Sequence, residues 1–214
     1  MLKITKIFSR MRNPLQGYFS FTKKIYLWFL FADCEKIGHP KNMKIGCIFF
    51  IMLSNGCVHI QYPTILHAEI ISFIEEAKEN FFLEYEEGNQ LYLYFEEFHT
   101  NYDGYLCYVM QDFKGAHPLT HLKTFNYLGG KYLHLDELFT EKDYQLFAKE
   151  AQRVLLPKLK KEEMFLDELF YPGIEPKKEN YQNIILLDDS YLIYFEHYQI
   201  APYGAGIQTL KIKR

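Results

Sequence analysis

Tyrosine and phenylalanine alternate with other residues along two successive segments, and this pattern restricts the possible folds more than any other feature. Residues 90–98 read QLYLYFEEF and residues 104–113 read GYLCYVMQDF, separated by a turn-forming stretch from Asn101 to Gly104. The 214-residue chain contains 18 tyrosines and 19 phenylalanines. Strand side chains alternate between two faces, and aromatic rings pack well across neighbouring strands. The two segments therefore predict neighbouring antiparallel strands.

Two segments with helical spacing lie before and after these strands. The first is an amphipathic segment that we expect to end at Gly88 and Asn89. The second begins at Thr140, has Asp143 three residues later as a capping partner, and should be kinked or ended by Pro157. The apolar face of the first predicted helix consists of Ile70, Phe73, Ile74, Ala77 and Phe81.

Further strands are predicted around turns in the rest of the chain. Gly129 and Gly130 separate HLKTFNYL from KYLHL and can supply the positive φ angles of a tight hairpin. The stretch NIILLDDSYLIYFEHY predicts two short strands around residues 188–190, and IQTLKIK predicts a last strand. The pattern as a whole predicts an α+β fold: an antiparallel sheet of short aromatic-rich strands with two packed helices. We expect residues 58–214 to form a single domain of this kind, which is long enough to bury a core.

The overall charge balance argues against nucleic acid as a partner. The chain has 24 Lys and Arg against 27 Asp and Glu, a formal net charge of −3. Binding to a phosphate backbone favours a basic surface, which this balance does not indicate. The shares of hydrophobic residues (49%) and charged residues (24%) are those of an ordinary globular protein.

Residues 1–57 differ in composition and form a basic and apolar leader. Up to Lys24 the leader has basic residues and no acidic one, and the apolar runs Ile25–Phe31 and Ile45–Leu53 follow. Both runs are shorter than the roughly 20 residues that cross a bilayer as a helix. Their length is closer to the apolar part of a signal peptide.

The segment that starts at Met43 resembles a bacterial lipoprotein signal. It reads MKIGCIFFIMLSNGC, in which Gly56 precedes Cys57 as a small residue precedes the lipid-modified cysteine. The alternative is that Met1 is the start and residues 1–56 form an irregular or anchoring extension. Of these, we favour an exported protein attached to the membrane, either through lipid on Cys57 or through the leader.

Two loop motifs, far apart in the sequence, carry a family resemblance. The first reads GAHP at residues 115–118, and the second reads YQIAPYGAG at residues 198–206. Together they resemble the RsiV C-terminal-like family, the extracytoplasmic domain of the anti-sigma factor RsiV, which also occurs in PdaC-type peptidoglycan deacetylases. The resemblance covers about residues 60–214. Its matching positions are Gly115, Ala116, His117, Pro118, Asn126, Gly130, Leu135, Leu138, Phe139, Tyr198, Ile200, Pro202, Tyr203 and Gly206.

The second motif has two interpretations. Proline fixes φ and glycine adopts angles closed to other residues, so the segment can be a structural corner between two strands, packed by Tyr203. Alternatively, the two motifs lie close together and present exposed tyrosine for recognition, since tyrosine offers a large contact area with little rotamer entropy to lose. The binding residues in the second interpretation are Tyr198, Tyr203, Pro202, Gly206, Gly115, Ala116 and His117.

An enzymatic alternative depends on His117 and His121. Their spacing in HPLTH is that of metal-binding histidine pairs on a helix, but Gly115 and Pro118 argue against a helix here. The chain has no G-x-S-x-G motif, and Cys107 lies among apolar residues where a thiol is unreactive. We therefore assign no catalytic residue, metal or cofactor. A small metal-dependent peptidoglycan hydrolase is the alternative function.

The family resemblance implies a ligand such as lysozyme or a cell-wall component, for instance a peptidoglycan fragment. The chain departs from an anti-sigma factor because the sequence shows no cytoplasmic sigma-binding segment followed by a full transmembrane helix. We therefore expect an exported, non-catalytic recognition domain at the cell envelope, in the form of a stand-alone lipoprotein.

Overall fold

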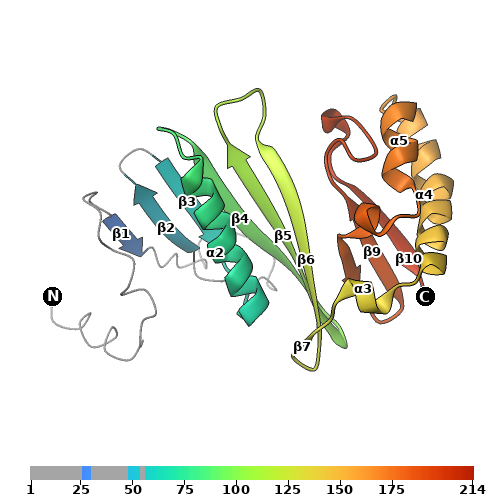
Figure 1. The fold of residues 1–214 in the computed structure, drawn as a ribbon, viewed down its shortest axis with the longest axis horizontal. Coiled ribbons are helices and arrows are strands. Elements are labelled where there is room, and N and C mark those ends of the chain that lie inside the picture. Colours follow the sequence, from blue (N-terminus) through green and yellow to red (C-terminus); the bar gives the residue numbers. More distant parts are fainter. Residues whose placement is uncertain (1–25, 30–47, 54–55) are drawn as a thin grey trace, which may run out of the picture.

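Two β-sheets of unequal size, each covered by helices, form the part of the chain that the structure describes (Figure 1). The computed structural model describes residues 26–29, 48–53 and 56–214, and their side chains from Val58 onward. The large sheet contains the strands β1 to β7 in sequence order, and the small sheet has the order β10-β9-β8. The predicted α+β class and its aromatic-rich antiparallel strands are confirmed, with the strands divided between two sheets.

The large sheet is antiparallel except for one pair, β3 and β4, which are parallel. A helix connects these two strands, as a parallel connection requires. The β4–β5 pair and the tight turn at Gly129 and Gly130, both with positive φ, were predicted and are confirmed. The strands are β1 (Tyr26–Phe29), β2 (Ile48–Leu53), β3 (Gly56–Gln61), β4 (Gln90–His99), β5 (Tyr102–Asp112), β6 (Leu119–Leu128) and β7 (Lys131–Tyr132).

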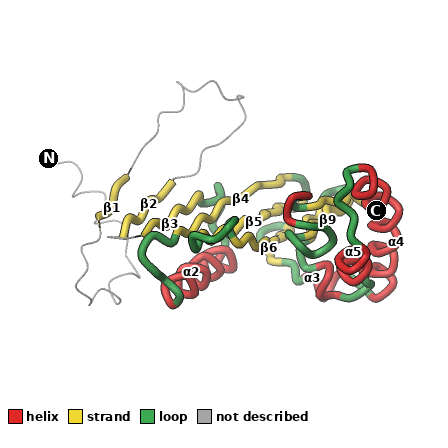
Figure 2. The backbone as a smooth tube through the Cα atoms, turned by 90° about the horizontal axis from the view of Figure 1, so that it is seen from above, coloured by secondary structure: helices red, strands yellow, loops and turns green. Residues whose placement is uncertain are grey.

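Helix α2 (Ala68–Leu83) covers one face of the large sheet (Figure 2). Its buried residues are Ile70, Ile74, Ala77 and Phe81, as the apolar spacing predicted. They pack on the inward residues of β4 and β5 in one core cluster. The helix ends at Leu83, before the expected glycine, and of the next four residues only Tyr85 still packs against this core.

The small sheet and the remaining helices share a second core, which includes Phe147, Leu155, Phe170, Ile193 and Leu210. The two short strands and the last strand were predicted and are confirmed, whereas α5 was not predicted. The elements are α3 (Leu135–Leu138), α4 (Glu141–Lys161), α5 (Asp167–Ile174), the 3-10 helices η3 (Lys178–Tyr181) and η4 (Tyr203–Ala205), β8 (Ile184–Leu186), β9 (Ser190–Phe195) and β10 (Gln208–Lys213).

Helix α4 begins as predicted but does not end at its proline. The Thr140 backbone N–H and hydroxyl each donate a hydrogen bond of 2.7 Å to the Asp143 carboxylate. The helix continues past Pro157 to Lys161. Proline removes one backbone hydrogen bond, but Leu155 and Leu159 on either side are buried, and their packing outweighs that loss.

Side chains of β6 join the two sheets. The Asn126 amide donates to the Ile184 carbonyl and accepts from the Leu186 N–H, both at 2.8 Å. The Thr124 hydroxyl accepts from the Ile184 N–H at 3.2 Å. These groups occupy the edge of β8 that has no partner strand, where unpaired backbone groups would otherwise be costly.

The predicted boundary at residue 57 falls within β3, where Gly56 and Cys57 pair with Leu53 and Met52. The Cys57 side chain and most of residues 1–57 lie outside the described residues, so the lipoprotein signal stays a prediction. Within the described ranges, no helix combines the length and the apolar character needed to cross a membrane.

Candidate functional site

The two sequence motifs meet in space, although 81 residues separate His117 from Tyr198. His117 lies in the loop between β5 and β6, and its ring stacks on Tyr203 with centroids 3.8 Å apart. Its Nε2 atom lies 3.1 Å from the Tyr198 hydroxyl. His197 also stacks on Tyr203, at 4.2 Å. The structure thus brings His117, Tyr198 and Tyr203 together, as the recognition interpretation expected, with His197 as an additional member.

The corner interpretation applies to the neighbours of Tyr203 rather than to Tyr203 itself. Ile200 and Ala201 are buried and anchor the 196–206 loop in the second core. Tyr203 is only partly buried and belongs to none of the core clusters found among the described residues. Its ring therefore packs against histidines at the surface. The other predicted residues lie around it: Pro202 and Gly206 flank η4, and Gly115 and Ala116 are exposed.

Tyr198 has an unusual backbone conformation. Its φ is +63°, a left-handed value that bulky residues rarely adopt, and its exposed fraction is 51%. Holding such a conformation costs on the order of 1–3 kcal/mol, and this kind of strain clusters at functional sites. The surrounding contacts must therefore stabilise a loop that presents this ring to solvent.

Gln199 supplies those contacts. Its side-chain amide donates to the carbonyls of Asn180 (2.8 Å) and Gly173 (3.3 Å) and accepts from the Glu196 N–H at 3.0 Å. A Cβ atom at Gly173 would lie only 2.0 Å from the Gln199 carbonyl oxygen. The base of the loop therefore rests directly on the backbone of α5, and only glycine allows this approach.

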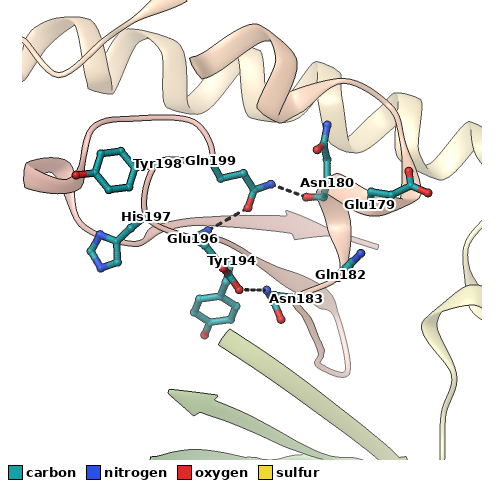
Figure 3. Close-up of a pocket in the computed structure, with 9 residues that line it drawn as sticks. All are labelled: Glu179, Asn180, Gln182, Asn183, Tyr194, Glu196, His197, Tyr198 and Gln199. Carbon is teal, nitrogen blue, oxygen red and sulfur yellow. Dashed lines mark hydrogen bonds between the residues drawn. The ribbon is translucent and has the colours of Figure 1, made fainter. Parts of the chain in front are cut away.

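A polar pocket of about 310 Å³ lies beside this loop (Figure 3). Its lining combines side-chain amides and carboxylates with aromatic rings, and no Lys or Arg contributes to it. The Nδ1 atom of His197 is shielded from solvent and has no hydrogen-bond partner among the described residues. The lining residues are Glu179, Asn180, Gln182, Asn183, Tyr194, Glu196, His197, Tyr198 and Gln199.

Glu196 links the pocket to β6. Its carboxylate accepts from the Leu122 N–H at 2.8 Å and from the Asn183 amide at 3.2 Å, and it lies 3.5 Å from His121 Nδ1. Burial opposes ionisation of Glu196, but the hydrogen bonds from His121, Leu122 and Asn183 outweigh it and lower its pKa. The same contact with Glu196, partly offset by burial, raises the pKa of His121.

The arrangement of the histidines does not favour the metal-dependent alternative. His121 lies in β6 and faces Glu196, while His117 lies before the strand and stacks on Tyr203. In the described part of the chain, no group of three or more His, Cys, Asp or Glu residues could hold a metal ion. Cys107 is fully buried, and burial raises the pKa of its thiol, which keeps it protonated.

The sequence did not indicate the pocket or the role of Glu196 in its lining. The only signal was the polar stretch ENYQN, residues 179–183, directly before the apolar strand IIL. A cluster of amides beside a buried strand suggests polar groups held at a fixed place. Its position opposite Glu196 and Gln199 depends on the fold and could not be read from the sequence.

Comparisons with known proteins show what the C-terminal part of the chain is similar to. Residues 136–214 match the family described as "Protein of unknown function (DUF3298)". A stretch of 104 residues is 35% identical to the peptidoglycan-N-acetylmuramic acid deacetylase PdaC of Bacillus subtilis (strain 168). This match covers 47% of the chain but 22% of the deacetylase, so it spans about a fifth of that protein.

Two solved structures of DUF3298 family proteins also match the chain. The protein from Bacteroides fragilis NCTC 9343 is 13% identical, with a TM-score of 0.48 over 90% of each chain. The protein from Pseudomonas aeruginosa PAO1 is 16% identical and similar in fold, with a TM-score of 0.51 over 89% of this chain and 88% of that chain. The resemblance inferred from the loop motifs is confirmed for residues 136–214, which contain the second motif and match the DUF3298 family, of unknown function.

Proposed function

We propose that this protein is a non-catalytic recognition domain of the cell envelope, which binds a sugar-type ligand in the polar pocket beside the 196–206 loop. The observation that carries the proposal is the combination of amides, carboxylates and the exposed ring of Tyr198 in one hollow. Sugar hydroxyls need both donors and acceptors, which side-chain amides supply together. Small-molecule sites are concave and use a few such polar groups to orient the ligand.

The charge of the site favours an uncharged ligand over an anion. The pocket is lined by Glu179 and Glu196 and by no basic residue. Residues 58–214 hold 15 Lys and Arg against 25 Asp and Glu, a net charge of −10. An acidic surface repels phosphate or carboxylate groups, whereas hydroxyl and amide groups carry no such cost.

A cell-wall glycan is the ligand source that we propose, with the protein outside the cytoplasm. The relative from Bacillus subtilis is named as an enzyme acting on peptidoglycan, which supports a cell-wall ligand for a domain that shares its sequence. A protein ligand such as lysozyme is the competing possibility. A protein ligand of this kind would contact the tyrosines at the surface and would not have to enter the pocket.

A titration with two probes separates these ligands. We expect the N-acetylglucosamine dimer, an uncharged disaccharide of a cell-wall sugar, to bind the full chain weakly and lysozyme not to bind. Tyr198→Ala should weaken disaccharide binding by about tenfold, the effect of losing one important contact, without lowering the melting temperature. Tyr171→Ala is the matched control, because Tyr171 is 44% exposed but lies on α5 outside the pocket. Binding of lysozyme alone, or unchanged binding by Tyr198→Ala, would contradict the proposal.

The proposed location is tested independently of the ligand. With the chain expressed from Met43 in a bacterial host, labelled fatty acid should enter the protein through Cys57, and Cys57→Ser should abolish the label. An unlabelled wild-type protein in the cytoplasmic fraction would show that the lipoprotein interpretation is wrong.

A further inference from the structure

Two stacked tyrosines lie on the face of the large sheet opposite α2. Tyr94 of β4 and Tyr108 of β5 are register partners, and their rings stack with centroids 4.6 Å apart and an interplanar angle of 11°. Their neighbours Leu93 and Phe95 point to the other face and are buried in the core beneath α2. Alternation along the strand therefore leaves Tyr94 37% exposed.

This pair lies beside the pocket and is joined to it through β6. The Tyr108 hydroxyl donates to Glu96 at 3.3 Å. Leu122 of β6 is the register partner of Tyr108, and its N–H donates to Glu196 of the pocket at 2.8 Å. Tyr194 also lines the pocket but is only 6% exposed, so the tyrosine pair and the pocket are neighbours across β6.

The same face extends further along the sheet. His59 of β3 and Tyr92 of β4 are register partners and stack at 4.6 Å with an interplanar angle of 5°. Neighbouring strands lie about 4.8 Å apart, and residues two apart on one strand are about 7 Å apart. The rings of His59, Tyr92, Tyr94 and Tyr108 thus lie on one face of three neighbouring strands, over a distance longer than one sugar unit.

We propose that the tyrosine face, formed by Tyr94 and Tyr108 with Glu96, binds further units of a linear glycan whose end occupies the pocket. This inference rests on the proposed function, and it names the ligand as a chain rather than a single sugar. Flat rings can stack on successive sugar units, while phenol hydroxyls and Glu96 accept hydrogen bonds at their edges.

The chemistry of this face selects an uncharged chain. By register, the side chains of β4 and β5 on this face include Glu96 and Asp112 and no Lys or Arg. An anionic polymer would meet the same repulsion as at the pocket. A purely apolar partner would leave the hydroxyl of Tyr94 and the carboxylate of Glu96 poorly solvated. The position of the tyrosine face beside the pocket and the lack of basic side chains on it both favour a glycan as its ligand.

The test compares N-acetylglucosamine oligomers of two lengths on the full chain. We expect the hexamer to bind at least tenfold more tightly than the dimer, because a longer chain can occupy the pocket and the tyrosine face together. Tyr94→Ala should reduce hexamer affinity to about that of the dimer and leave dimer affinity unchanged. Tyr94→Phe keeps the ring and should retain most of the difference, and Tyr171→Ala is the control at an exposed tyrosine outside this face.

The outcomes distinguish the tyrosine face from the pocket. Equal affinity for both lengths, with dimer binding still lost in Tyr198→Ala, overturns the extended site and leaves the pocket. Hexamer binding that depends on Tyr94 but not on Tyr198 supports the face and overturns the pocket. Binding of neither oligomer overturns both. Melting temperatures of the variants near that of the wild type show that each loss of binding is local.

Discussion

The large sheet and the loop-bearing half of the molecule are held in place in different ways. In the large sheet, β4, β5 and β6 are consecutive in the chain and pair as neighbours, with α2 packed across them. The 196–206 loop instead depends on contacts between distant residues: Gln199 with Gly173, 26 positions away, and Tyr198 with His117, 81 positions away. Local pattern determines the sheet, whereas the candidate site requires the completed fold.

We expect the largest effect on stability from the Asn126 hydrogen bonds that join the large sheet to the small sheet. Asn126→Ala removes both hydrogen bonds to β8 and leaves buried backbone groups of Ile184 and Leu186 unpaired. We expect a loss of about 3 kcal/mol in the free energy of unfolding, measured by denaturant titration. Asn101→Ala, at an exposed turn residue, should change it by less than about 0.5 kcal/mol. Similar losses in both variants would show that β6 does not hold the small sheet in place.

We expect the second-largest effect on stability from the contact between α5 and the 196–206 loop. Gly173→Ala forces a methyl group into the Gln199 carbonyl, and we expect a loss of about 2 kcal/mol together with weaker ligand binding. Gly204→Ala is the matched control within the loop, since its nearest neighbour, Met164 Cε, is at an ordinary 3.9 Å. Equal stability of the two variants would mean that the loop does not rest on α5.

Tyr198 separates stability from recognition. Tyr198→Gly relieves the strain of a φ of +63°, so we expect stability to rise by up to about 1 kcal/mol while sugar binding is lost. Thermal unfolding and a ligand titration on the same sample measure both effects. A destabilised variant would instead show that the Tyr198 side chain holds the loop together.

We expect the smallest effect on stability from the ion pair of His121 and Glu196, whose contribution depends on pH. The raised pKa of His121 means that its contribution is present below about pH 6.5 and is lost as pH rises through the raised value. The lowered pKa of Glu196 means that its contribution is present above its ordinary pKa of 4.5 and is lost as pH falls through the lowered value.

Replacing His121 should therefore matter only within that window. We expect His121→Asn to lower the unfolding free energy by about 0.5 kcal/mol near pH 5.5, as is usual for an exposed ion pair, and by almost nothing near pH 9. Denaturant titrations at the two pH values measure the difference. A loss of equal size at both values would show that packing, not charge, accounts for the effect.

The sequence predicted elements whose determinants are local. Alternation identified β4 and β5, apolar spacing identified α2, and the Thr140–Asp143 pair marked the start of α4. Of the two outcomes predicted for Pro157, a kink or an end of the helix, the end is wrong, because burial of Leu155 and Leu159 favours continuing the helix and only the tertiary structure reveals it. Local rules fail where distant packing decides the outcome.

The candidate site was predicted only in part for the same reason. Tyr198, Tyr203 and His117 were identified from their two motifs, and the structure brings them together. The hydrogen bonds from β6 to β8 join residues about 60 positions apart, and no local pattern records them. The pocket residues of η3, and Gln182 and Asn183 that follow it, therefore could not be assigned to the same site as Tyr198.

An amide chemical-shift titration with the N-acetylglucosamine dimer shows whether the pocket beside the 196–206 loop binds a sugar-type ligand. We expect the largest shifts at Gln182, Asn183 and Gln199, with smaller shifts at Tyr198. Shifts absent from these residues, or concentrated on the α2 side of the large sheet, would show that the dimer does not bind in this pocket.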